Sequence, residues 1–187
     1  MLTQSASGCL TRAGNGAFCG KVGQSQKACE QMSNSAANAG QIYNSVYRHG
    51  CDEKRRIQVP AMWRPTEDSV QFTLIVWPQR NEGPCLRVLP PKEMAELMAE
   101  LDAMPNTNPN KTVLKRIIGS KSTQVALDKA GRICVPEDLA TAAGIKVGME
   151  VVLVGLLDRF EIWEPERYAR VNAADDVLAS EAFKLME

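Results

Sequence analysis

An internal repeat limits the fold of this chain more than any other feature. Residues 51–60 read CDEKRRIQVP and residues 127–136 read LDKAGRICVP, so Asp, Arg, Ile, Val and Pro recur at an offset of 76. Further along, residues 86–93 (LRVLPPKE) align with residues 160–167 (FEIWEPER) at an offset of 74, and the intervening loops therefore differ by two residues. The pattern predicts two copies of one unit, each made of a hairpin, a short helix, a second hairpin and a helix.

The second copy shows this pattern most clearly. Residues 124–127 alternate in polarity and predict a strand, and Asp128 begins a turn in which Gly131 can take a positive φ. The chain returns as a strand that Pro136 ends. The later elements are predicted from periodicity and from breaking residues. They are a short helix before Gly144, two strands and a C-terminal helix, at residues 137–143, 150–154, 159–163 and from 164 onward.

The repeats divide the chain into three parts. Residues 41–110 hold the first repeat, including a predicted amphipathic helix at residues 92–104. Residues 111–187 hold a linking helix, the second repeat and the C-terminal helix. Residues 1–40 are rich in Ser, Ala, Gly, Asn and Gln and cannot bury enough surface to offset their ordering entropy. We expect them to be a disordered polar extension, with Met32 as an alternative start of translation.

Charge is unevenly distributed, although the formal net charge of the chain is zero. Residues 111–132 hold six basic side chains and one acidic one, whereas residues 137–187 hold eleven acidic and five basic side chains. This separation suits a basic working face on an acidic body. A solvated surface whose charge varies by chance is the alternative.

The composition disfavours several classes of protein. Residues 151–157 form the longest apolar stretch, which Gly155 interrupts and which is too short to cross a membrane. The six cysteines form no CxxC pair and His49 is the single histidine, so we expect no metal site and no cofactor. The N-terminus lacks the charged and apolar regions of a signal peptide, which favours a cytoplasmic protein with reduced thiols. We find no phosphate-binding glycine loop and no activated nucleophile, and we expect no enzymatic activity.

The two predicted turns share an Asp-x-x-x-Arg pattern that suits nucleic-acid binding. Aspartate favours turn geometry, and its carboxylate can pair with Arg and fix the direction of the guanidinium group. A two-stranded ribbon fits the major groove of double-stranded DNA, where Arg can bind guanine or phosphate. Lys54 and Lys129 would add phosphate contacts. The alternative is an ordinary surface hairpin with a weak ion pair, which the recurrence of the pattern disfavours.

The motif that follows these turns resembles a known module. The string Asp-x-x-Gly-Arg-Ile-x-Val-Pro, then a helix, Gly-Ile-x-x-Gly and Val-Val-Leu-Val, is similar to the AbrB-type swapped hairpin. Two copies, with Phe-Glu-Ile-Trp-Glu-x-Glu-Arg-Tyr in the second, resemble the MraZ family over roughly residues 43–172. The resemblance implies a mixed, mainly β fold with short helices, in which two tandem β-α-β modules form a pseudo-twofold barrel.

The resemblance also implies a function. Members of this family are cytoplasmic, nucleoid-associated regulators at the start of the division and cell-wall gene cluster. They bind short direct repeats in double-stranded promoter DNA and assemble as homo-oligomeric rings, with many hairpin tips on one face. Carried over to this chain, the DNA-binding residues are Asp52, Arg56, Asp128 and Arg132, with Lys54, Arg55 and Lys129 beside them.

Arg55 departs from the family pattern, because it stands where the family has glycine. A bulky residue disfavours a positive φ, so we expect the first turn to be remade. This leaves open whether the first tip reads bases, while the added charge suits a phosphate contact.

Several residues have a structural interpretation. We expect Trp63, Trp77 and Trp163 to anchor the core rather than to stack on bases, and Cys134 to be an inward-facing strand residue. A redox switch between Cys51 and Cys134 is the alternative for the cysteines. A second class of function is a protein-interaction module, such as an AbrB-type antitoxin whose C-terminal helix grips a partner. Such antitoxins usually carry one copy of the hairpin, and the tandem repeat disfavours this class.

Overall fold

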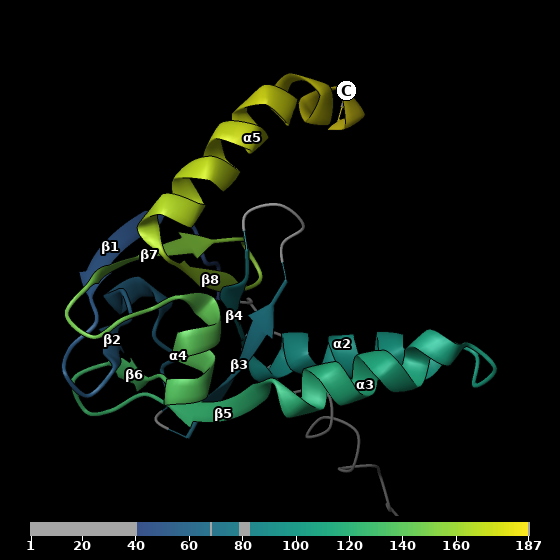
Figure 1. Cartoon of the computed structure of the whole chain (residues 1–187), viewed down its shortest axis with the longest axis horizontal. Helices are drawn as coiled ribbons and strands as arrows, with labels where there is room; N and C mark the ends of the chain where they lie inside the picture. Colours follow the sequence, from purple (N-terminus) through teal and green to yellow (C-terminus); the bar gives the residue numbers. More distant parts are fainter. Residues whose placement is uncertain (1–40, 68, 79–82, 187) are drawn as a thin grey trace, which may run out of the picture. The chain divides into compact units, whose positions relative to one another are not determined.

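The computed structural model describes residues 41–67, 69–78 and 83–186 of the chain (Figure 1). The strands are β1 (Val46–Gly50), β2 (Arg56–Gln58), β3 (Gln71–Trp77), β4 (Cys85–Leu89), β5 (Ser122–Ala126), β6 (Arg132–Cys134), β7 (Glu150–Gly155) and β8 (Phe160–Trp163). The helices are α2 (Pro91–Ala103), α3 (Pro109–Ser120), α4 (Glu137–Ala143) and α5 (Pro165–Phe183), with short 3-10 turns η1 (Ala61–Trp63) and η2 (Lys184–Met186). The expected mainly β fold with short helices is confirmed.

Six of these strands pair in an antiparallel sheet with the order β1-β7-β8-β4-β3-β5, and β2 pairs with β6 in a separate ribbon. The elements expected in the second repeat are present, with ends that shift by one or two residues. For example, β5 covers Ser122–Ala126 instead of residues 124–127. Closure of the strands into a barrel stays a prediction.

The pairing exchanges strands between the two repeats. Strand β1 of the first repeat pairs with β7 of the second, whereas β5, the counterpart of β1, pairs with β3 of the first. Strands β4 and β8 join the two halves, and Arg87 lies opposite Glu161 there. Because positions 87 and 161 are equivalent in the two repeats, a pseudo-twofold axis passes between them. The β2–β6 ribbon has the same relation, since Ile57 pairs with its counterpart Ile133.

Both repeats contribute to one large cluster of buried side chains. Trp63 and Phe160 lie at its centre with their ring centroids 5.1 Å apart. The prediction that the tryptophans anchor the core is confirmed for Trp63 and Trp163, which are 0% and 1% exposed. Trp77 is half-buried, and the guanidinium carbon of Arg87 lies 3.9 Å from its ring centroid, a cation–π contact.

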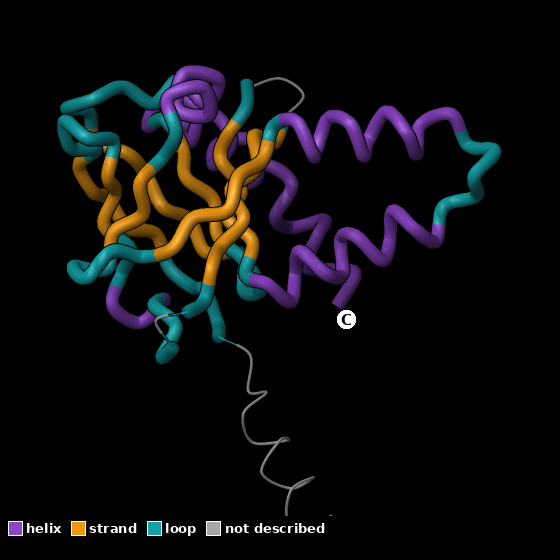
Figure 2. Tube along the Cα trace, turned by 90° about the horizontal axis from the view of Figure 1, so that it is seen from below, coloured by secondary structure: helices purple, strands orange, loops and turns teal. Residues whose placement is uncertain are grey.

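Helices leave the sheet in two places. Helices α2 and α3 run side by side as a hairpin that extends from the sheet, and α5 extends from it separately (Figures 1 and 2). The short α4 ends at Gly144, whose φ of 75° confirms the predicted left-handed position. Arg167 fixes the first turn of α5, because its Nη1 donates to the carbonyl oxygens of Ala143 and Pro84, each at 2.9 Å.

Within the described residues, none of the helices combines the length and the apolar character that a membrane crossing requires. The predicted disordered extension at residues 1–40, together with Met32, lies outside the described residues. The division of the remaining chain at residue 110 stays a prediction.

Candidate nucleic-acid interface

Two turns of matching geometry lie next to each other because β2 pairs with β6. We call the turn at residues 51–56 tip 1 and the turn at residues 127–132 tip 2. In tip 1 the N–H of Arg55 donates to the carbonyl of Asp52 at 2.9 Å, and in tip 2 the N–H of Gly131 donates to that of Asp128 at 2.8 Å. The ribbon continues past the strands, since Arg55 and Gly131 accept hydrogen bonds from valines of the opposite repeat, at 2.9 and 3.0 Å.

The aspartate of each tip holds both the turn and the arginine. Oδ1 of Asp52 accepts from the backbone N–H groups of Lys54 and Arg56, each at 2.9 Å, while Oδ2 accepts from Nε of Arg56 at 2.7 Å. Nη2 of Arg56 lies 2.7 Å from the same oxygen. Each carboxylate thus closes its own turn and fixes the direction of a guanidinium group, as the Asp-x-x-x-Arg pattern predicts.

Tip 2 repeats this arrangement residue for residue. Oδ1 of Asp128 accepts from the N–H groups of Ala130 and Arg132 at 2.9 and 3.0 Å, and Oδ2 accepts from Nε of Arg132 at 2.9 Å. The two tips are also joined, because Nη1 of Arg132 lies 3.7 Å from Oδ2 of Asp52. The arginine side chains keep about 30% of their surface exposed. The site is therefore one connected group of two carboxylates and two guanidinium groups, open to solvent.

The expectation that Arg55 would remake the first turn is wrong. Arg55 takes a φ of 56°, close to the 76° of Gly131, and makes the same turn hydrogen bond. This conformation carries a cost for a residue with a Cβ, because the side chain approaches the backbone. Nη2 of Arg55 lies 3.5 Å from Oε2 of Glu137, and its Nε is buried with no hydrogen-bond partner among the described residues.

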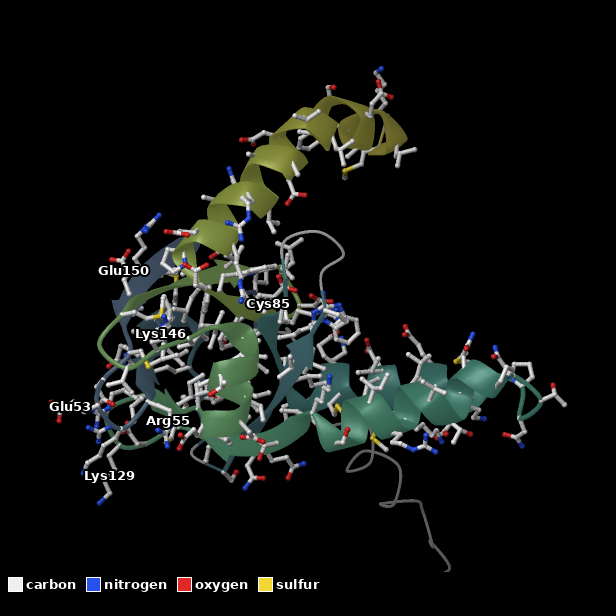
Figure 3. The ribbon with its side chains drawn as sticks, viewed as in Figure 1. Glu53, Arg55, Cys85, Lys129, Lys146 and Glu150 are labelled. Atoms are coloured by element: carbon white, nitrogen blue, oxygen red, sulfur yellow. The ribbon has the colours of Figure 1, made fainter. Side chains whose placement is uncertain are left out.

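The two lysines of the tips are exposed, as their proposed phosphate contacts require. Figure 3 shows Glu53 and Lys129 at the outer end of the tips, with Arg55 closer to the body of the fold. Tip 1 carries three basic and two acidic side chains, and tip 2 carries two basic and one acidic. Each tip is therefore cationic by one charge.

Cys51 in tip 1 and Cys134, which lies beyond tip 2, differ in exposure. Cys51 is buried, and burial raises the pKa of its thiol. Cys134 is exposed, so the expectation that it faces inward is wrong. It is the last residue of β6, and its Sγ is 3.4 Å from the carbonyl oxygen of Lys54.

The hydrogen bonds of the tips shift the acidity of their carboxyl groups. The side-chain hydrogen bond from Arg56, followed by the backbone N–H of the same residue, lowers the pKa of Asp52 to about 2. The corresponding bonds from Arg132 lower the pKa of Asp128. In turn, Asp52 raises the pKa of Arg56. The two carboxyl groups therefore stay ionised at neutral pH.

One arginine beside tip 2 was missed by the sequence analysis. The side chain of Arg64 crosses Gly131 so closely that an added Cβ on residue 131 would lie 2.5 Å from its Cζ. A cavity of about 380 Å³ opens here, and Arg64, Lys129 and Gly131 are among the residues that line it. Sequence spacing gave no signal for Arg64, because it lies 67 positions from the residue that it covers.

In the described ranges, His, Cys, Asp and Glu side chains do not gather in groups of three or more that could hold a metal ion.

Comparison with known proteins identifies a family and several similar proteins. The family described as "MraZ protein, putative antitoxin-like" matches residues 119–183, which include tip 2 and the whole of α5. Among similar proteins are three named transcriptional regulator MraZ. That of Clostridium acetobutylicum is 33% identical over 78% of this chain and 98% of its own length. That of Roseiflexus sp. strain RS-1 is 31% identical over 74% of this chain and 92% of its own. That of Thermus thermophilus is 32% identical over 71% of this chain and 88% of its own.

These relatives cover both tips and nearly their whole lengths align, so the likeness is not confined to one hairpin. The chain belongs to the MraZ family.

Proposed function

We propose that this protein is a sequence-specific regulator of transcription that binds double-stranded promoter DNA through tips 1 and 2. The observation that carries the proposal is the pairing of two cationic hairpin tips, each with an arginine oriented by an aspartate. The names of its relatives, transcriptional regulator MraZ, support it. The target we propose is the division and cell-wall gene cluster, at short direct repeats, and we propose a cytoplasmic, nucleoid-associated location.

The chemistry of the tips fits this role. An arginine has five N–H groups, and the bonds from Nε and Nη2 to aspartate leave the outer end of the guanidinium group available. That end matches the O6 and N7 acceptors of guanine in the major groove. The exposed Lys54 and Lys129 would bind phosphates on either side and set the register of the ribbon.

We also propose that the protein acts as a homo-oligomer, in which tips from several copies contact successive half-sites. A ribbon with two small tips binds few bases, and repetition raises the effective concentration of the remaining tips. Helix α5 supports assembly, because none of its residues is buried and Val177, Leu178 and Phe183 are more than 60% exposed. Helix α3 exposes Val113, Leu114 and Ile117 among basic residues, whereas the end of α5 is acidic. We therefore propose that α5 of one copy packs against α3 of another copy.

Binding to promoter fragments at several salt concentrations tests the proposal. We expect log K to fall with log salt by about 0.9 for each phosphate that the protein neutralises. We expect Arg132→Ala to weaken binding to the specific site by tenfold or more, since one base contact is worth about 1–3 kcal/mol, and to leave the fold intact. Lys92→Ala, which removes an exposed cation of α2 outside the tips, is the matched control. Unchanged specific affinity of a folded Arg132→Ala protein would rule out the role of this residue.

The second candidate function is a protein-interaction module of the antitoxin type. The description of the matching family, and the exposed apolar residues of α5, favour it. Pull-down of the full chain, followed by its α5 variant Leu178→Glu, separates the two. A small partner protein that is lost in this variant favours the antitoxin role, and a complex of copies of this chain alone favours the regulator. An enzymatic activity is not part of either proposal.

A further inference from the structure

Arg64 is fixed over tip 2 by contacts with the residue that follows β2 and the residue that precedes β6. Its Nε donates to the carbonyl oxygen of Val59 at 3.0 Å, and the N–H of Val59 donates to the carbonyl of Gly131 at 3.0 Å. The side chain then crosses Gly131 in the space that a Cβ would occupy. Only glycine at position 131 leaves room for the guanidinium group of Arg64.

In tip 1 the guanidinium group beside the turn comes from the turn residue itself. At the repeat offset of 76, Gly131 corresponds to Arg55, and Arg64 corresponds to Ala140. In tip 1 the turn residue itself carries the guanidinium group, and it reaches Glu137 at the start of α4. Helix α4 is the counterpart of η1, after which Arg64 stands. Each tip thus has one arginine beside its turn. In tip 1 it is the turn residue Arg55, and in tip 2 it is Arg64, which follows η1.

The surroundings of Arg64 suit an anion. Lys129 lines the same cavity of about 380 Å³, so two cations flank one opening at the base of tip 2. Asp128 and Glu67 also line it, and the carboxylate of Asp128 is bound by Arg132. The Nε of Arg64 is used by Val59, and its two terminal nitrogens make no hydrogen bond within residues 41–67, 69–78 and 83–186, so they can meet a ligand with paired oxygens.

We infer that Arg64 and Lys129 form a binding site for a phosphate of the DNA backbone beside tip 2. The inference rests on the proposed function and adds to it a contact that positions the ribbon without reading bases. A phosphate contact of this kind acts equally on specific and non-specific DNA. Arg132, in contrast, is assigned to the reading of bases.

The test measures the affinity of the full chain for its promoter DNA and for unrelated DNA across a series of salt concentrations. Loss of one phosphate contact reduces the slope of log K against log salt by about 0.9. We expect this reduction in Arg64→Ala, with equal weakening on both DNAs. Arg64→Lys keeps the charge and should keep most of the slope, and Lys92→Ala, which removes an exposed cation of α2, should match the wild-type protein.

A double variant tests whether an arginine at the turn can replace Arg64. Arg64→Ala with Gly131→Arg gives tip 2 the residue types that tip 1 has at the equivalent positions, an arginine at the turn and an alanine in place of Arg64, although the counterpart of Glu137 is Ala61. We expect it to recover the slope that Arg64→Ala loses. A folded double variant with the same slope as Arg64→Ala would show that an arginine at position 131 does not replace Arg64.

The outcomes separate this inference from the proposed function. If the wild-type protein binds no promoter DNA, the proposed function fails. If it binds and Arg132→Ala loses specificity while Arg64→Ala keeps the wild-type slope, only the phosphate site is overturned. Weaker binding of Arg64→Ala with an unchanged slope, not rescued by Arg64→Lys, would assign Arg64 to a purely structural role and would also overturn it.

Discussion

Arg55 stands in a conformation that glycine would adopt at no steric cost. Its φ of 56° and its buried Nε, which has no partner in the part of the chain that the structure describes, both oppose folding. Its ion pair with the exposed Glu137, at 3.5 Å, offsets little of this cost. A residue that is unfavourable for the fold and cationic at a proposed DNA site is best explained by binding.

Arg55→Gly separates stability from binding. We expect the free energy of unfolding to stay unchanged or to rise by up to about 1 kcal/mol, because relief of the backbone strain exceeds the greater entropy of glycine in the unfolded chain. The affinity for DNA should fall and the salt slope should decrease. Urea unfolding and DNA titration of the same protein sample check both. A marked loss of stability with unchanged affinity would show that Arg55 serves the fold.

The carboxyl group of Asp52 makes the stability of tip 1 depend on pH. Its pKa of about 2 in the folded protein lies below the ordinary value near 4. The stabilisation is therefore fully present above pH 4 and is lost as the pH falls toward 2. Asp52→Asn keeps an oxygen for the two backbone N–H groups but removes the charge. We expect the difference in unfolding free energy between wild type and Asp52→Asn to shrink steadily as pH falls from 5 toward 2.5. A difference that is constant over this range would argue against the ion pair as its source.

Sequence reasoning located some of these residues and missed others for identifiable reasons. Asp128, Gly131 and Arg132 follow from local chemistry, since turn geometry and the Asp–Arg pair involve neighbours in the chain. The prediction for Arg55 was wrong because the ribbon, held by hydrogen bonds from both repeats, imposes the turn on a residue that disfavours it. The site of Arg64 depends on a contact between distant positions, which no local pattern contains.

At the scale of elements, Arg167 links three segments. Its Nη1 binds the last carbonyl of α4 and the carbonyl of Pro84 before β4, while its own N–H is capped by Glu164 at the start of α5. An added Cβ on Gly144 would lie 2.8 Å from its Nη2, so the left-handed end of α4 also depends on this packing.

Arg167→Ala should therefore weaken the fold. Two carbonyl groups lose a charged donor, and such bonds contribute about 1.5–3 kcal/mol each, less where water replaces the donor. We expect the free energy of unfolding to fall by about 2–3 kcal/mol in urea titrations followed by circular dichroism. Arg170→Ala, one turn further along α5 and exposed, should change it by less than about 0.5 kcal/mol. Equal effects of the two variants would contradict the role assigned to Arg167.

Periodicity predicted the elements of the second repeat but not their partners. An alternating strand buries one face whichever neighbour it pairs with, so β1 and β5 gave no sign that they would exchange between repeats. The repeat indicates only that the two halves pair in equivalent ways, and it does not say which strands are partners. Once two equivalent strands cross antiparallel, the residues on the axis must face their own counterparts.

At the scale of the whole molecule, the pseudo-twofold axis gives Arg87 and Glu161 a distinct place. In an assembly of identical hairpins, one residue type would meet itself across such an axis, and like charges there would repel. Here two repeats in one chain place an arginine opposite a glutamate, joined at 2.9 Å with side chains 16% and 6% exposed. The duplication thus permits a buried ion pair that a symmetric dimer of one repeat could not form.

Charge reversal tests this reasoning. Arg87→Glu places two carboxylates across the axis and removes the contact with Trp77, and we expect the free energy of unfolding to fall by about 3–5 kcal/mol. Adding Glu161→Arg restores opposite charges at equivalent positions, so the double variant should recover more than half of the loss. Recovery is incomplete because Trp163 donates to Oε2 of Glu161 at 3.0 Å, a bond that arginine cannot accept. Arg48→Glu, which reverses an exposed pair with Glu150, should cost no more than about 1 kcal/mol. If the double variant unfolds as easily as Arg87→Glu, the two positions are not interchangeable, and the axis describes the path of the backbone without governing its electrostatics.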